Sequence, residues 1–113
     1  MIDSRLHHAF YGWLYQVTTA KSSVAKNIWL EGNYCDVYVR YFMGKIEIAN
    51  VNVQPEWQQK GIFTNFLTIV EHCGRPIKIE NVLNDDLAKH LERRAGYTCK
   101  RGSPVDLPSF YWG

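Results

Sequence analysis

The order of helix-like and strand-like segments along the 113-residue chain predicts a single α/β (α+β) domain. Hydrophobic residues switch between helical spacing and two-residue alternation in the order α–β–β–β–α–β–α–β–β. Near the middle, a strand, a helix and a strand follow one another closely, which predicts a right-handed parallel crossover. We therefore expect a mixed sheet flanked by helices, with residues 1–113 forming one domain.

The composition narrows the classes of function. Apolar residues make up 46% of the chain and aromatic residues 14%, which is typical of a globular protein. The net charge is +2 and the basic residues are scattered, so we do not expect nucleic acid as a partner. No apolar run approaches the length of a membrane span, and the first residues do not resemble a signal peptide. We expect a cytoplasmic protein without a membrane partner.

The residue types that bind metals do not form a recognisable pattern. Cys35, Cys73 and Cys99 are widely spaced and no CxxC pair is present. His7 and His8 are adjacent, so on a helix they point in different directions, and no third ligand is evident. We predict no metal site.

The first half of the chain reads as one helix followed by strands. Helical spacing predicts an amphipathic helix over about residues 4–18, with Asp3 or Ser4 as its cap. A short strand over 28–30 is followed by a loop and by two segments, 36–42 and 46–53, rich in β-branched and aromatic residues. A tight turn joins these two segments, which predicts an antiparallel hairpin.

The second half alternates helices with short strands. After Pro55 the hydrophobic spacing becomes helical, and one apolar stripe comprises Ile62, Phe63, Phe66, Leu67, Ile69 and Val70. A short strand over 77–82 and a helix over about 84–95 follow. The segments 97–100 and 109–112 are two further strands, joined by a loop rich in Gly and Pro.

The segment Gln58–Gly61 has the position of an anion-binding loop, after a strand and at the start of a helix. A helix N-terminus offers unpaired N–H groups and the positive end of the helix dipole, and glycine lets an anion approach the backbone. The spacing is neither that of a Walker loop nor that of a Rossmann fingerprint. Taken alone, one glycine at a helix start is more typical of an ordinary loop-to-helix junction.

In its setting, this loop resembles that of the GNAT acyltransferase superfamily, which reads Gln/Arg-x-x-Gly-x-Gly/Ala. The chain supplies Gln58, Gly61 and, at the last place, Phe63. The stretch from Glu47 to Gly61 also resembles the core of the family's histone acetyltransferases. Asn84 matches the family's asparagine after the next strand, and Gly96-Tyr97 its helix-ending Gly-Phe. The resemblance covers about residues 36–97.

The resemblance implies a coenzyme A site. The pantetheine arm would extend along Val51 to Val53 like an added strand, and the Val53 N–H would stabilise the thioester oxyanion. Asn84 would bind the pantetheine, although it is also a good helix cap. The pyrophosphate would sit on the backbone N–H groups of Lys60, Gly61, Ile62, Phe63 and Thr64.

The function implied is that of an acetyl-CoA-dependent N-acetyltransferase, in which a primary amine attacks the thioester directly. The acceptor stays open: a protein lysine, an N-terminal amine or a small amine. Glu47 matches the family's general base, but could equally be a strand glutamate paired with Lys45 or Arg40. Asn50 and Asn52 could line the substrate cleft or satisfy a β-bulge.

Two departures from the family's pattern weaken the case for catalysis. Phe63 is bulky where the family has Gly or Ala, so it must point into the core. The family's tyrosine acid falls on Leu91 or Glu92, and we expect His90, Tyr97 or water to replace it. The alternative is a catalytically degenerate GNAT-fold module that acts by protein–protein binding. Exposed aromatics in the last strand would also make a homodimer unsurprising.

Overall fold

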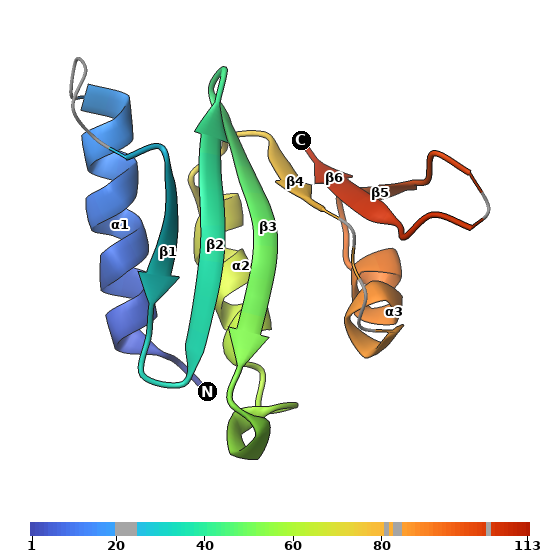
Figure 1. Cartoon of the computed structure of the whole chain (residues 1–113), viewed down its shortest axis with the longest axis horizontal. Helices are drawn as coiled ribbons and strands as arrows, with labels where there is room; N and C mark the ends of the chain where they lie inside the picture. The colour runs from blue at the N-terminus through green and yellow to red at the C-terminus, as the bar shows by residue number, and fades with distance from the viewer. Residues whose placement is uncertain (20–24, 81, 83–84, 104) are drawn as a thin grey trace.

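A computed structural model describes residues 1–19, 25–80, 82, 85–103 and 105–113. These residues form a six-stranded sheet with three α-helices, which confirms the predicted α/β architecture (Figure 1). The helices are α1 (Ser4–Thr19), α2 (Ile62–His72) and α3 (Asp85–Arg93). The strands are β1 (Asn27–Glu31), β2 (Cys35–Phe42), β3 (Lys45–Val53), β4 (Ile77–Ile79), β5 (Tyr97–Lys100) and β6 (Ser109–Trp112). Their order across the sheet is β1–β2–β3–β4–β6–β5.

The predicted hairpin of β2 and β3 forms the centre of the sheet. The two strands pair antiparallel from Cys35↔Val53 to Phe42↔Lys45. The register shifts between Tyr38, which pairs with Asn50, and Val39, which pairs with Ile48. This leaves Ala49 without a partner on β2, so β3 carries the β-bulge that was one expectation for its asparagines.

The predicted parallel crossover is confirmed, because β3 and β4 run parallel and α2 connects them. The strand predicted over 77–82 ends earlier, at Ile79. Beyond it, the Val82 N–H bonds the Pro108 carbonyl at 2.8 Å instead of continuing along β3. Since β3 itself runs on to Val53, the two parallel strands diverge.

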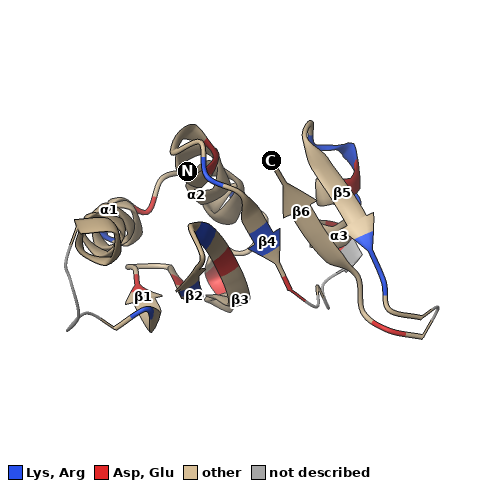
Figure 2. Ribbon diagram, turned by 90° about the horizontal axis from the view of Figure 1, so that it is seen from above, with Lys and Arg blue, Asp and Glu red and all other residues tan. Residues whose placement is uncertain are grey.

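The helices α1 and α2 cover one face of the sheet, as Figure 2 shows for the β1–β3 region. Phe10 of α1 and Phe66 of α2 are fully buried and meet edge to face, with ring centroids 5.5 Å apart. Alternate strand residues pack beneath the helices, as the two-residue period requires. These buried strand residues include Val37, Val39, Ile46, Ile48, Ile77, Ile79 and Phe110.

The intervening strand residues form the opposite face, which we call the polar face. It is defined by Arg40, Glu47, Lys78, Glu80, Tyr111 and Lys100. Of the aromatic residues in the last strand, Phe110 is fully buried and Tyr111 and Trp112 are partly buried. The expectation that these aromatics are exposed is therefore wrong, and the reason it gave for a homodimer does not hold.

Asp3 ties the start of α1 to the turn between β1 and β2. It is fully buried, and its carboxylate accepts the backbone N–H groups of Leu6, Asn33, Tyr34 and Cys35 at 3.2, 3.0, 2.8 and 3.2 Å. Burial alone would raise the pKa of Asp3, but these four donors reverse the effect and hold the pKa below its usual value. Asp3 is thus the cap that was predicted for α1.

None of the helices in the described ranges is long and apolar enough to cross a membrane.

Candidate functional site

A cleft of about 530 Å³ opens where the end of β3 meets the first turns of α2 and α3. Most of the residues predicted to bind the cofactor line it, namely Val51, Val53, Gln58, Gly61, Ile62, Phe63 and Thr64. These residues come from two segments separated by a turn of 3₁₀-helix at Pro55–Trp57. The predicted loop and the predicted strand edge therefore share one cavity.

The divergence of β3 from β4 builds one wall of the cleft. The last pair between these strands is Ile48↔Ile79, so Val51 and Val53 lie beyond the paired region. The Gln58 side chain donates from Nε2 to the Val53 carbonyl at 3.2 Å, which holds the following loop against the end of β3. A strand edge without a neighbouring strand is suited to accept an extended ligand by main-chain hydrogen bonds.

Gly61 shapes the other wall, at the N-terminus of α2. Its φ of 77° lies in the left-handed region that favours glycine, and α2 begins at the next residue. Its carbonyl accepts the N–H of Asn65 and the hydroxyl of Thr64, both at 3.0 Å. No side chain among the described residues caps α2, so its first N–H groups are left for water or an anion.

Two of the predicted cofactor residues are not among those lining the cleft. Lys60 is exposed beside it, and its carbonyl accepts the Met1 amino group at 3.1 Å. A backbone contact of Lys60 with a phosphate stays a prediction. Asn84 lies outside the described residues, so its role stays a prediction too.

The Phe63 side chain points into the core, as expected from its size. Its side chain is only 8% exposed and stacks on Phe66, with ring centroids 6.2 Å apart. The ring thus packs in the core, and it borders the cleft without filling the loop. The substitution of Gly or Ala by Phe at this place is compatible with an open cleft.

Glu47 lies on the polar face and does not line the cleft. Its carboxylate pairs with Arg40 Nε at 3.3 Å and with Lys45 Nζ at 3.6 Å. Both ion pairs that the sequence left as an alternative to catalysis are therefore present. Arg40 also pairs with Glu80, so Glu47 belongs to a charged network with a defined geometry. Its role as a base stays a prediction.

The two asparagines of β3 differ in their position relative to the cleft. Asn50 and Asn52 are both exposed and pair in register with Tyr38 and Asp36 of β2. Asn52 lines the cleft, whereas Asn50 does not. Only Asn52 is thus placed beside the candidate cofactor site.

The residues considered in place of the family's tyrosine acid have different environments. Leu91 is fully buried in the core and Glu92 is exposed on α3 outside the cleft lining. Tyr97 is near the other end of the helix, where burial and the adjacent Glu71 carboxylate raise its pKa. His90 alone of these residues lines the cleft, and its Nε2 is buried without a hydrogen-bond partner in the described part of the chain.

Sequence reasoning did not identify Asp86 as a cleft residue. Asp86 lies in the first turn of α3 and lines the cleft opposite the start of α2. Its Oδ2 accepts a hydrogen bond from Gln59 Nε2 at 3.4 Å, which links the two sides of the cleft. The positive φ of Gln59, 59°, brings its side chain to this position. No local pattern signals such a contact between residues 27 positions apart.

A charged network fixes α3 against α2. Arg94 donates from Nε and Nη2 to the two oxygens of Glu71, both at 2.8 Å, and from Nη2 to the Thr68 hydroxyl at 2.9 Å. Burial would raise the pKa of Glu71, but the Arg94 guanidinium and nearby Tyr97 outweigh it and lower the pKa. The helices whose first turns flank the cleft are thus linked near their C-terminal ends.

No group of three or more His, Cys, Asp or Glu residues gathers within the described ranges.

Comparisons with known proteins identify the fold. No family model matches the sequence, and no curated protein matches it. A proposed acyl-CoA N-acyltransferase from Klebsiella pneumoniae superposes with a TM-score of 0.59 at 14% identity, over 95% of this chain and 86% of that one. The PaiA N-acetyltransferase from Thermoplasma acidophilum, in complex with coenzyme A, gives a TM-score of 0.56 at 9% identity, over 92% and 69%.

A third solved structure agrees with these two. A proposed acetyltransferase from Agrobacterium tumefaciens superposes with a TM-score of 0.54 at 15% identity, over 97% of this chain and 90% of that one. At such identities the likeness concerns the fold. The chain has the fold of the GNAT acetyltransferases.

Proposed function

We propose that this protein is an acetyl-CoA-dependent N-acetyltransferase that transfers an acetyl group to a primary amine by direct attack. The observation that carries the proposal is the cleft itself. It joins an unpaired strand edge, at Val51 and Val53, to the uncapped N-terminus of α2 at Gly61. An extended pantetheine arm suits the strand edge, and the diphosphate that follows it in the cofactor suits the helix N-terminus.

The residues of the chain fit the cofactor in the following roles. The first N–H groups of α2 would hold the diphosphate, and the edge of β3 would hold the pantetheine. The bound acetyl thioester would supply the activated acyl group. As the amine attacks, the C–S bond would break and coenzyme A would leave as a thiolate that takes a proton from water or from His90 in the cleft. The Val53 N–H would stabilise negative charge on the thioester oxygen. Glu47 would take the proton of the acceptor amine from the polar face, through water.

The decisive measurement is calorimetric titration of acetyl-CoA into the protein, with dephospho-coenzyme A as a second ligand. We expect saturable binding at micromolar concentrations for acetyl-CoA. Dephospho-coenzyme A retains the diphosphate and should bind as well, with the difference reporting the contribution of the 3′-phosphate. Absence of binding at millimolar acetyl-CoA would overturn the proposal.

A substitution of Glu47 can test its role as a base, and the same network of ion pairs offers a matched control. Glu47→Gln is expected to lower kcat for acetyl transfer by about 100-fold or more, because a positioned base contributes that much. Glu80→Gln removes the other carboxylate that pairs with Arg40 and should leave kcat within a few-fold of the wild type. Equal effects of the two substitutions would mean that Glu47 acts only through the network.

Two features of the structure favour a second function. Both oxygens of Glu47 are engaged by cations, and Asp86 places a carboxylate in the cleft. These features suit a GNAT-fold module that has lost catalysis and binds a protein partner. Acetyl transfer to a lysine-containing peptide would rule that alternative out.

A further inference from the structure

Four side chains form an ordered array on the face of β1 and β2 that points away from α1 and α2 (Figure 2). Trp29 and Glu31 of β1 pair in register with Tyr38 and Asp36 of β2. Paired residues point to the same face, and Asp36, Tyr38 and Arg40 alternate along β2. The four residues therefore extend the polar face, and we call them the acidic–aromatic array.

The aromatic half of the array offers a surface for a cation. The rings of Trp29 and Tyr38 lie with their centroids 5.4 Å apart and are tilted by 59°. Packing between strands accounts for this contact, but it leaves Trp29 42% exposed. An arginine guanidinium can stack on such a ring, and tryptophan is the best of the aromatic residues in this role.

The acidic half of the array carries two negative charges. Glu31 lies directly opposite Asp36, and like charges in this position repel one another. Arg5 offsets part of the repulsion at 3.7 Å from Glu31, but both side chains are more than half exposed, so this pair contributes little. Asp36 accepts the Gly32 N–H at 3.1 Å and forms no ion pair with any described residue. A cationic ligand is therefore the complement of this surface.

The array is level with the part of β3 along which the cofactor is proposed to bind. Tyr38 pairs with Asn50 and Asp36 with Asn52, and Asn52 also lines the cleft. A cofactor added to the edge of β3 lies one strand spacing beyond it. The middle of β1–β2 lies one and a half spacings to the other side, so about 12 Å separates the two.

We propose that the acidic–aromatic array binds an arginine of a polypeptide acceptor, four residues away from the lysine that is acetylated. The proposal rests on the function proposed above. Residues four apart in an extended chain point to the same side and lie ~13 Å apart, which matches the separation of the array from the cofactor. A guanidinium matches the carboxylates and can stack on the rings at the same time. The acceptor is therefore a protein segment and not a small amine.

The experiment compares two blocked peptides by NMR titration of the protein without acetyl-CoA. The first is Ac-Arg-Gly-Ser-Gly-Lys-Gly-Ser-Gly-Arg-NH2, in which an arginine on each side of the lysine allows for either chain direction. In the second, citrulline replaces both arginines, so the shape is kept and the charge is removed. The arginine peptide should bind about tenfold more tightly, because only it can form charge-assisted hydrogen bonds with the array.

Two substitutions and one matched control locate this preference. Asp36→Asn keeps an oxygen that can accept the Gly32 N–H, and Glu31→Gln lies at an exposed position, so neither should disturb the fold. Each should abolish most of the preference for arginine. Asp106→Asn is the same chemical change at an exposed aspartate in the loop between β5 and β6, at the other edge of the sheet. It should keep the full preference.

The outcomes separate this proposal from the proposed function. Equal binding of the two peptides, or equal effects of Asp36→Asn and Asp106→Asn, would overturn the array as a site while acetyl-CoA titration still tests the function. A preference for arginine without any acetyl-CoA binding would overturn the acceptor role and the proposed function together. In an active enzyme, the arginine peptide should have a KM about tenfold below that of the citrulline peptide at the same kcat, as expected for uniform binding. Equally efficient acetylation of free lysine amide would contradict a polypeptide acceptor.

Discussion

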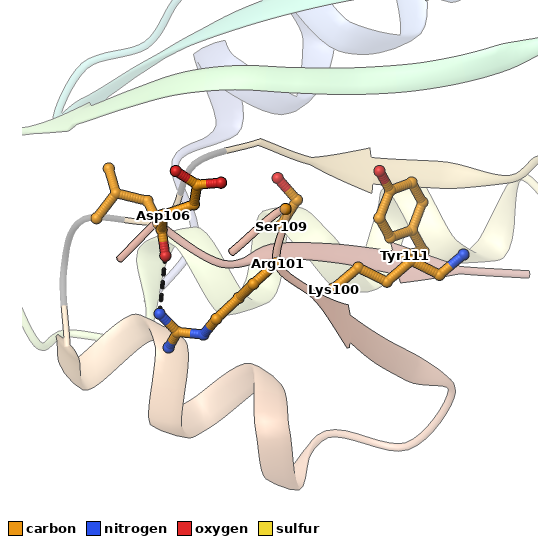
Figure 3. A pocket seen from close by; sticks show the side chains of 7 residues that line it. Lys100, Arg101, Asp106, Ser109 and Tyr111 are labelled. Carbon is orange, nitrogen blue, oxygen red and sulfur yellow. Dashed lines mark hydrogen bonds between the residues drawn. The ribbon is translucent and has the colours of Figure 1, made fainter. Parts of the chain in front are cut away.

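The cleft and a second pocket, of about 480 Å³ beside the loop that joins β5 to β6 (Figure 3), are built from different parts of the polypeptide. In the cleft, the groups available to a ligand belong largely to the backbone, at the edge of β3 and at the first turn of α2 after Gly61. In the pocket, they belong to side chains, above all those of Lys100 and Arg101. The cleft contains a carboxylate, that of Asp86, at a place where a phosphate is proposed to bind, whereas the pocket has an excess of positive charge.

This contrast determines how each site can be disrupted. A backbone site survives most side-chain substitutions and is lost when a side chain adds repulsive charge or shifts the helix that supplies its N–H groups. A side-chain site is lost by neutralising one residue, without a change in the fold. Substitutions that affect one site and spare the other therefore test whether the two are independent.

The largest effect is expected for Gly61→Asp. The new carboxylate would lie at the start of α2, where the diphosphate is proposed to bind, and like charges in contact cost several kcal/mol. Affinity for acetyl-CoA should fall by at least about 100-fold in calorimetry.

Gly74→Asp controls for the backbone strain of that substitution. Gly74 has a φ of 72°, close to the 77° of Gly61, and a Cβ atom added there would meet no atom within 4 Å. Both variants therefore carry a similar conformational cost, and aspartate tolerates the left-handed region better than most residues. If Gly74→Asp lost as much affinity as Gly61→Asp, the loss would report destabilisation and not repulsion.

A smaller effect is expected for Glu71→Gln, which weakens the link between α2 and α3. The variant loses a doubly hydrogen-bonded contact to Arg94, so the free energy of unfolding in urea at pH 7 should fall by about 2 kcal/mol. The affinity for acetyl-CoA should fall severalfold, since residues of α3 also line the cleft. An unchanged free energy of unfolding at pH 7 would show that the ion pair does not stabilise the fold.

The pH dependence of this difference has a defined sign. Folding lowers the pKa of Glu71 below its usual value of 4.5, so the stabilisation is fully present above that value. It is lost as the pH falls through the folded pKa, and the gap between wild type and Glu71→Gln should then close. Asp3, whose pKa is also lowered, titrates in both proteins and cancels in the comparison.

The cleft could be predicted from sequence better than the pocket, because its ligand-binding groups belong to the backbone beside a local sequence signal. A glycine before an apolar helical stripe marks a helix N-terminus locally, which identified Gly61. The resemblance to the GNAT family added Val53, on the strand that precedes this loop. The residues that line the pocket are also close in sequence, but their charges acquire meaning only through the order β4–β6–β5. That order places Lys78 beside Tyr111, which sequence patterns did not show.

The limits of sequence reasoning are clearest at α3. Counting from two motifs placed the missing tyrosine at Leu91 or Glu92, and the packing places the first in the core and the second in solvent. Arg94, the residue after α3, contacts Glu71 and Thr68 of α2, and no local sequence pattern signals these long-range contacts. The same helix also presents His90 and Asp86 to the cleft, which its sequence alone did not indicate.

The smallest effect, an increase in affinity, is expected for Asp86→Asn. Removing an exposed carboxylate that faces a bound diphosphate should tighten acetyl-CoA binding about threefold, and asparagine keeps an oxygen that can accept the hydrogen bond from Gln59. Glu92→Gln, an exposed neutralisation on the same helix outside the cleft, should have no effect. The gain should shrink as salt is added, because exposed charges are screened over about 8 Å at physiological ionic strength. Weaker binding of Asp86→Asn would instead mean that its charge holds Gln59 in place to close the cleft, and that the diphosphate lies elsewhere.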